Sequence, residues 1–301
     1  MKATSIFLSS ALVVVMVCVM VSSGFANVWI DENFDGTSIF VQGDGKGATV
    51  SPPDATLDIY DGDGSIASPV GNVLTQTGAK VTSKFLDGTG CYQIESGETI
   101  TVVDPYDNPG NGNFVILQFG VNVDPIPSAG TVGEMRYNWD TDTGVGASPD
   151  HSFYVKFVSD GSKVDIIAGE DLFNATPSEA TIGTLNSGSE WDFVTMVMQN
   201  GTGSQTYTHA LLPGGALTLN AGVTFFCSST TAGHFVAFGS DNGAAKKGTS
   251  WNISATGGTL YVDTLYWEGG MDVDSGAVSI NIRPFNYSGS PSSVQEWSLF
   301  E

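Results

Sequence analysis

Apolar residues recur at every second position in short runs along this chain, and clusters of Gly, Pro, Asn and Asp separate the runs. A period of two residues is typical of β-strands that bury one face. The clearest run is 115–123, where Val, Leu and Phe alternate with a second set that includes Gln118 and Asn122. The runs 153–158 and 163–168 flank the sequence Ser-Asp-Gly-Ser and predict a hairpin.

Further strands are expected along the rest of the chain. No amphipathic helix is expected. The strands fall at 191–199, 205–211, 216–219 and 234–239, with less regular ones at 57–60, 79–85 and 99–103. Many short strands without helices predict an all-β fold, built as a sandwich or a barrel.

The stretch 259–267, TLYVDTLYW, also alternates like a strand. Strict alternation places Leu260, Val262 and Tyr266 on one face, and the other face then receives Tyr261, Asp263, Leu265 and Trp267. A carboxylate on a strand costs free energy unless a partner satisfies it. We expect the partner of Asp263 in the acidic sequence DENFDG at 31–36, near the other end of the chain.

The first 26 residues have the pattern of a secretory signal peptide. Lys2 precedes an apolar run at 11–21, and small residues follow before residue 27. The apolar run is shorter than the ~20 residues of a membrane-spanning helix. We therefore expect a secreted protein, extracellular or at the cell surface, with no membrane insertion after cleavage. The remainder divides into one domain at 27–270 and a C-terminal extension at 271–301, with an extra strand near 278–282.

The chain is strongly acidic, with 32 Asp and Glu residues against 10 Lys and Arg and a formal net charge of −22. Such a field repels nucleic-acid phosphates and anionic lipid, and it favours cations as small partners. Only 14% of the residues are charged and 41% are hydrophobic, which predicts a folded core rather than an acidic disordered segment.

Two cysteines follow the predicted signal peptide, and the sequence leaves their state open. Cys91 and Cys227 could form one disulfide in an exported protein, or remain as free thiols. The sequence has no C-x-x-C motif and no Cys/His cluster, which argues against a structural zinc site.

The sequences DENFDG and YVDTLYWEGG resemble the two ends of concanavalin A-like jelly-roll domains. That group includes laminin G-like (LamG-like) modules, legume-type lectins and laminarinase-type glycoside hydrolases, and the resemblance covers about residues 28–270. It implies an antiparallel jelly-roll β-sandwich with the first and last strands side by side. It also implies a structural calcium ion held by Asp31 or Glu32, Asp35 and Asp263, which are hard oxygen ligands. The alternative is that Asp263 accepts hydrogen bonds from backbone or tyrosine groups.

A second group of residues has the chemistry of a sugar site. Tyr137 and Trp139 are followed by Asp140 and Asp142 within six residues. Aromatic rings stack on the apolar faces of sugars, and carboxylates accept hydrogen bonds from sugar hydroxyls. The alternative interpretation is that some residues of this cluster belong to the core and the others to a loop, with no role in ligand binding. Weaker candidates of the same kind are Tyr106, Asp107 and Trp251.

The sequence gives no clear signal for catalysis. The E-x-D-x-x-E motif of laminarinase-type hydrolases is absent, which removes the main reason to expect their activity here. Glu170 and Asp171 are adjacent and would point to opposite faces of a strand. The three histidines belong to no catalytic motif, and we expect each at the surface or at a strand edge.

The composition and the resemblance together predict an exported, non-catalytic carbohydrate-binding or cell-surface matrix protein, with a polysaccharide or other glycan as its partner. A structural protein that self-associates through residues 271–301 is the first alternative. A polysaccharide hydrolase or lyase with an unrecognised site is the second.

Overall fold

A computed structural model describes thirteen segments of the chain. They are residues 26–32, 34, 74–86, 88–103, 113–140, 151–172, 178–200, 205–210, 212–219, 226–230, 233–240, 247–271 and 277–279. Most of the predicted signal peptide and the strand expected at 57–60 lie outside these segments. In the described part, no helix is long and apolar enough to cross a membrane.

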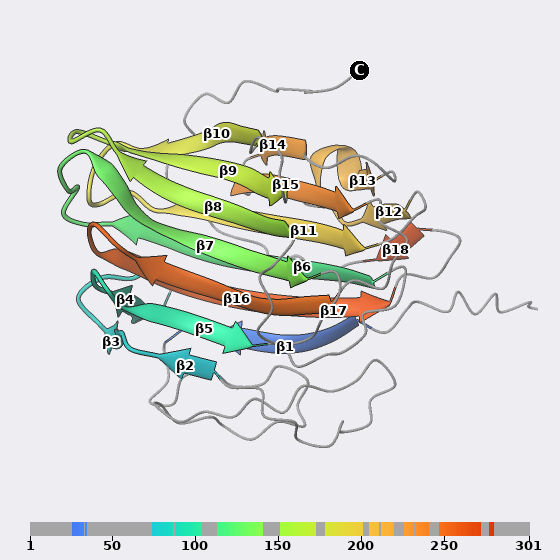
Figure 1. Cartoon of the computed structure of the whole chain (residues 1–301), viewed down its shortest axis with the longest axis horizontal. Helices are drawn as coiled ribbons and strands as arrows, with labels where there is room; N and C mark the ends of the chain where they lie inside the picture. The colour runs from blue at the N-terminus through green and yellow to red at the C-terminus, as the bar shows by residue number, and fades with distance from the viewer. Residues whose placement is uncertain are drawn as a thin grey trace, which may run out of the picture.

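The described strands form two large sheets and one small sheet (Figure 1). We call the first large sheet the β6 sheet; its order is β14-β15-β11-β6-β17-β4-β3, and β1 pairs with β17. Its strands are β1 (Ala26–Glu32), β3 (Ala79–Val81), β4 (Cys91–Ile94), β6 (Asn113–Val123), β11 (Asp192–Asn200), β14 (Phe226–Thr230), β15 (Gly233–Ser240) and β17 (Leu260–Met271).

We call the second large sheet the β8 sheet, with the order β10-β9-β8-β7-β16-β5-β2. Its strands are β2 (Leu74–Gln76), β5 (Thr99–Val103), β7 (Gly130–Asp140), β8 (His151–Ser159), β9 (Val164–Leu172), β10 (Ser178–Leu185) and β16 (Lys247–Ala255). The small sheet has the order β13-β12-β18, with β12 (Gln205–Thr208), β13 (Ala216–Leu219) and β18 (Ala277–Ser279). A 3-10 turn, η1 (Pro213–Gly215), precedes β13.

The core lies between the two large sheets, as the alternation predicts. Leu117, Phe119 and Val121 of β6 belong to the same buried cluster as Phe153 and Phe157 of β8. The chain changes sheets repeatedly, since β4 and β6 lie in one sheet while the intervening β5 lies in the other. The predicted antiparallel β-sandwich is therefore confirmed, and each sheet depends on the other to bury its inner face.

Strand β17 lies where the sequence places it, but its two faces differ from strict alternation. It pairs antiparallel with β1, so the two ends of the domain lie side by side. A β-bulge follows Asp263, where Thr264 has a φ of 48° and the pairing with β6 shifts register. The bulge turns Leu265 into the core together with Leu260 and Val262. The prediction that Leu265 faces away from Leu260 is wrong for this reason.

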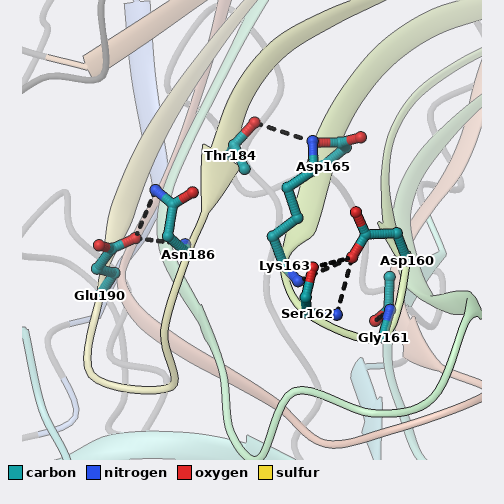
Figure 2. Close-up of polar contacts among 9 residues, drawn as sticks. Asp160, Gly161, Ser162, Lys163, Asp165, Thr184, Asn186 and Glu190 are labelled. Carbon is teal, nitrogen blue, oxygen red and sulfur yellow. Dashed lines mark hydrogen bonds and ion pairs between the residues drawn. The ribbon is translucent and has the colours of Figure 1, made fainter.

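The predicted hairpin between β8 and β9 is confirmed, and Asp160 organises its turn (Figure 2). One carboxylate oxygen of Asp160 accepts hydrogen bonds from the backbone N–H of Ser162 at 2.8 Å and of Lys163 at 3.0 Å. The Ser162 hydroxyl donates a third at 2.7 Å. Hydrogen bonds from Ser162 and Lys163 lower the pKa of Asp160, so the carboxylate stays ionised in the turn.

The strand expected in the C-terminal extension is β18. It pairs in parallel with β12 of the same chain, from Thr206 opposite Ala277 to Thr208 opposite Ser279. Among the described strands β18 lies at the edge of the small sheet, and self-association through it stays a prediction.

The outer face of the β6 sheet is buried as well on its central strands β6 and β11. Gln118 donates a hydrogen bond to Thr195 at 2.9 Å, and both side chains are fully buried there. The loop between β3 and β4 lies over this face, where the Lys84 ammonium contacts Asp124 at 2.6 Å and the Gly188 carbonyl at 2.6 Å. Strand β13 also contacts β15. Partly exposed polar side chains are found instead on the outer face of the β8 sheet.

The structure rules out a disulfide between Cys91 and Cys227. Strands β15, β11, β6 and β17 separate β14, which carries Cys227, from β4, which carries Cys91. At about 4.8 Å per strand the separation is about 24 Å, whereas a disulfide needs Cα atoms within about 7 Å. Cys91 is a buried free thiol.

Cys91 is expected to resist alkylation in the folded protein. Burial, and then the nearby negative charge of Asp263, raise the pKa of the Cys91 thiol to about 12, so almost no reactive thiolate exists at pH 8. Iodoacetamide should label it at least about 100-fold more slowly than in denaturant, as followed by mass spectrometry of its peptide. Equal rates in the two conditions would contradict the buried position.

Candidate functional site

Two of the predicted ligand-binding aromatics lie in the core instead of on loops. Trp251 of β16 and Tyr137 of β7 are opposite each other in the β8 sheet, and their exposed fractions are 0% and 2%. Both occupy alternate strand positions that face the β6 sheet. In this structure neither ring presents a face to a sugar.

The side chains of the remaining predicted ligand-binding residues lie outside the part of the chain that the structure describes. Trp139 and Asp140 lie at the end of strand β7, and only their backbone is described. Tyr106, Asp107 and Asp142 lie outside the described segments. A ligand role for these five residues stays a prediction.

Asp263 is fully buried at the bulge of β17, and backbone groups satisfy its carboxylate. One oxygen accepts the N–H of Leu86 at 2.7 Å, and the other accepts the N–H of Thr264 at 2.7 Å. This confirms that Asp263 accepts backbone hydrogen bonds. Gly120 lies opposite Asp263, and a Cβ there would come within 2.3 Å of the Leu86 side chain. The loop therefore packs closely over the bulge because residue 120 lacks a side chain.

The predicted calcium site stays a prediction. Asp31 and Glu32 pair through their backbone with Tyr266 and Leu265, which brings their strand next to β17. Their side chains and the whole of Asp35 lie outside the described segments. Within those segments, no group of three His, Cys, Asp or Glu side chains could hold a metal ion.

Two further expectations about ionisable residues have clear outcomes. Glu170 is 3% exposed, and the Asp171 side chain is 52% exposed, so the two carboxylates do point to opposite faces of β9. His234 is not at the surface. It is buried, and its Nε2 lies 2.7 Å from a carboxylate oxygen of the buried Asp192. That position was missed because a side-chain contact between β11 and β15 leaves no local sequence pattern.

The outer face of the β8 sheet gathers polar side chains from six adjacent strands, and we call it the polar face. Cross-strand pairing aligns Asn252, Arg136 and Tyr154 in one row, and Ser254, Glu134 and Lys156 in the next. The polar face consists of Thr99, Thr101, Asn252, Ser254, Glu134, Arg136, Asn138, Ser152, Tyr154, Lys156, Asp165, Asp171, Glu179 and Thr181.

Arg136 lies at the centre of the polar face, and its hydrogen bonds fix the position of its guanidinium. Its Nε and Nη2 donate to the two carboxylate oxygens of Glu134 at 2.8 and 3.2 Å, and its Nη1 donates to the Ser152 hydroxyl at 2.5 Å. Asp171 lies 3.7 Å away, and the guanidinium lies 4.8 Å from the centre of the Tyr154 ring. Partial burial alone would lower the pKa of Arg136, but hydrogen bonding and charge from Glu134 raise it.

Tyr154 and Glu179 form the second fixed unit of the face. The tyrosine hydroxyl donates to Glu179 at 2.6 Å, and the Lys156 ammonium pairs with the same carboxylate oxygen. Burial, and then the bond to Glu179, raise the pKa of Tyr154, so the hydroxyl keeps its proton. Burial would raise the pKa of Glu179, but its bonds from Lys156 and Tyr154 lower it overall. The Tyr154 ring is 3% exposed, so it acts as a hydrogen-bond donor and not as a stacking platform.

This arrangement presents fixed hydrogen-bonding groups on a partly exposed surface. The side chains of Arg136, Glu134 and Lys156 are about one-quarter exposed, and Asp171 is about half exposed. A ligand laid across the sheet could bond to their remaining lone pairs and N–H groups, and to the amides of Asn138 and Asn252. This surface was not predicted from the sequence, because β7 and β16 were not predicted as strands. Their polar side chains could therefore not be assigned to one face of a sheet.

Comparison with known proteins gives no family for this chain. No family model matches the sequence, and no curated protein matches it. Among solved structures, one described for the interaction of botulinum neurotoxin type C with two ganglioside molecules has a TM-score of 0.40 and 7% identity, covering 82% of this chain and 49% of that chain. The binding domain of botulinum neurotoxin DC in complex with rat synaptotagmin II gives the same values.

A third structure is the CBM2 module of the evolved Dit of Lactobacillus casei BL23 phage J-1. It has a TM-score of 0.36 and 12% identity, covering 84% of this chain and 100% of that module. The chain spans about half the length of the neurotoxin structures it matches. Similarities at this level carry no inference about what this chain binds.

Proposed function

We propose that this protein is a non-catalytic glycan-binding β-sandwich, and that the polar face of the β8 sheet is its binding surface. The observation that carries the proposal is the network around Arg136 and Tyr154. It holds donors and acceptors from β7, β8, β9 and β10 in fixed positions on a partly exposed face. Sugar hydroxyls need many such groups, each contributing a modest amount of free energy.

The geometry of a sheet suits an extended ligand. Neighbouring strands are about 4.8 Å apart, and side chains on one face of a strand recur about every 6.8 Å. Polar groups therefore repeat in two directions across the face, so a polysaccharide chain could form several hydrogen bonds at once. Because ion pairs already hold Arg136, Glu134 and Lys156 in place, little side-chain entropy is lost on binding.

Three further features belong to the same proposal. The protein is exported to the outside of the cell. A calcium ion bound by Asp263 with Asp31, Glu32 or Asp35 reinforces the junction of the first and last strands, as in the concanavalin A-like domains that the two ends resemble. Residues in the sequence cluster of Trp139, Asp140 and Asp142, and at Tyr106 and Asp107, extend the contact with the glycan.

Removing two amides from the polar face should weaken glycan binding. The double variant Asn138→Ala, Asn252→Ala loses hydrogen-bonding groups on β7 and β16, and at about 1 kcal/mol per bond the affinity should fall about 10-fold or more. Binding to a panel of soluble neutral polysaccharides is measured by affinity electrophoresis and calorimetry. The control is Gln93→Ala, a partly exposed amide on the β6 sheet.

Two results would contradict the proposal in different ways. If the unaltered protein binds no glycan in the panel, the function is wrong. If it binds but the double variant binds equally well and remains folded, the polar face is not the binding surface.

A further inference from the structure

We infer that the polar face selects uncharged glycans over acidic ones, because carboxylates of the same face already neutralise its cations. This inference rests on the proposed glycan-binding function and specifies the class of ligand. It follows from how the positive groups of the described face are paired.

Arg136 is the group best suited to bind a sugar carboxylate, but three N–H groups of its guanidinium already donate to protein side chains. Glu134 takes two N–H groups of the guanidinium, at 2.8 and 3.2 Å, and Ser152 takes a third donor at 2.5 Å. Asp171 adds a second negative charge 3.7 Å away. A uronate could form a bidentate pair with the Nε/Nη2 edge of Arg136 only by displacing Glu134, which would leave that carboxylate partly buried without its partner. At the Nη1/Nη2 edge it would share Nη1 with Ser152 and lie near the carboxylate of Asp171, which is 3.7 Å from Nη1.

The other cations near the face are paired in the same way. Lys156 contacts Glu179, and Lys163 lies 2.9 Å from Asp165 beside the β8–β9 turn (Figure 2). Asp165 also accepts a hydrogen bond from Thr184 at 3.0 Å, which fixes its position. In this part of the described structure, three cations thus face four carboxylates, and the ion pairs leave a negative excess.

An acidic glycan would therefore meet repulsion at both short and long range. On the face, its carboxylates would lie near Asp171 and Glu179, whose side chains are 52% and 35% exposed. Over the whole protein, the formal net charge of −22 opposes the approach of a polyanion. An uncharged glycan avoids both penalties and can still donate its hydroxyls to the carboxylate oxygens in charge-assisted hydrogen bonds.

The same argument gives aminated glycans no large advantage. An exposed ion pair such as one between a sugar ammonium and Asp171 contributes about 0–1 kcal/mol, and the long-range attraction is screened at physiological salt. The chemistry of the face is thus directed at hydroxyl groups.

The test uses pairs of glycans that share linkage and length but differ at the sixth carbon. Neutral glucans and mannans are compared with their C6-oxidised, uronate-containing forms and with C6-amino forms, at 0.15 M salt. The unaltered protein should bind the neutral member of a pair at least about 10-fold more tightly than the oxidised member. The double variant Glu134→Gln, Asp171→Asn exposes the Arg136 guanidinium and should gain at least about 5-fold in affinity for the oxidised member.

The matched control changes the net charge equally but at another place. The double variant Glu95→Gln, Glu98→Gln alters two carboxylates at the β4–β5 turn, and its preference should stay that of the unaltered protein. If the first double variant fails to fold, the single variant Asp171→Asn, at a half-exposed position, takes its place. Equal or tighter binding of the oxidised member by the unaltered protein overturns the inference alone, while binding of no glycan overturns the proposed function as well.

Discussion

Replacing Trp251 by alanine is expected to lower the free energy of unfolding by about 3–5 kcal/mol, the usual cost of removing a large buried aromatic side chain. Trp251 is fully buried and is among the largest side chains of the core. It faces Tyr137 across the strands, and Tyr137 faces Phe153, whose ring centre lies 4.5 Å from that of Phe238 in the other sheet. The cavity would therefore open in the layer that joins the two sheets.

Chemical denaturation followed by circular dichroism measures this effect. The control Trp251→Phe keeps an aromatic ring at the position and should cost less than the alanine variant, because the residual cavity is smaller. A loss below about 1 kcal/mol for Trp251→Ala, together with lost glycan binding, would show that Trp251 contacts ligand after all.

Asp263→Ala should destabilise the protein by about 2–6 kcal/mol, at about 1–3 kcal/mol for each of the two partly buried N–H groups that lose a charged acceptor. Those donors belong to Leu86 and Thr264, each 2.7 Å from the carboxylate. Thr264 also has a positive φ of 48°, a conformation that costs free energy for a residue other than glycine. Without the carboxylate of Asp263 to stabilise it, the bulge is expected to rearrange. Asp263→Asn keeps one acceptor oxygen and should cost less.

The same variant separates the two explanations of Asp263. If calcium binds there, a chelator should lower the melting temperature of the unaltered protein, and Asp263→Ala should abolish that sensitivity. If the melting temperature of the unaltered protein is indifferent to the chelator, Asp263 acts through its contacts within the protein, which include the two backbone hydrogen bonds. A chelation effect that persists in Asp263→Ala places the ion elsewhere.

Alternation predicted several strands of both large sheets, namely β6, β8, β9, β11 and β15. The pairing of β1 with β17 was expected from the resemblance of the two ends of the domain to concanavalin A-like domains. Strands β7 and β16 were missed although they alternate as well: Met135 and Tyr137 are flanked by Glu134, Arg136 and Asn138, and Asn252 lies between Trp251 and Ile253. Residues 137–142 were interpreted instead as a cluster of candidate ligand-binding residues, although Tyr137 points into the core.

Other features depend on register, which local patterns do not determine. The bulge at Thr264 inverts the faces of β17, and nothing in TLYVDTLYW distinguishes an inserted residue from regular alternation. The bond from Tyr154 to Glu179 joins strands that are 25 residues apart, and its geometry exists only once β9 lies between them. The Cys91 and Cys227 pairing was equally undecidable until the order of the strands was known.

Carboxyl footprinting, with and without a bound neutral polysaccharide, tests the central claim most directly. A carbodiimide couples an amine label to exposed carboxylates, and mass spectrometry reports the labelling of each peptide. Asp171 and Glu179 on the polar face should be protected by the glycan, while Glu95 and Glu98 at the β4–β5 turn should label as before. Unchanged labelling of Asp171 and Glu179, with protection at Asp140 and Asp142 instead, would contradict binding across the β8 sheet and move the site to the sequence cluster at 137–142.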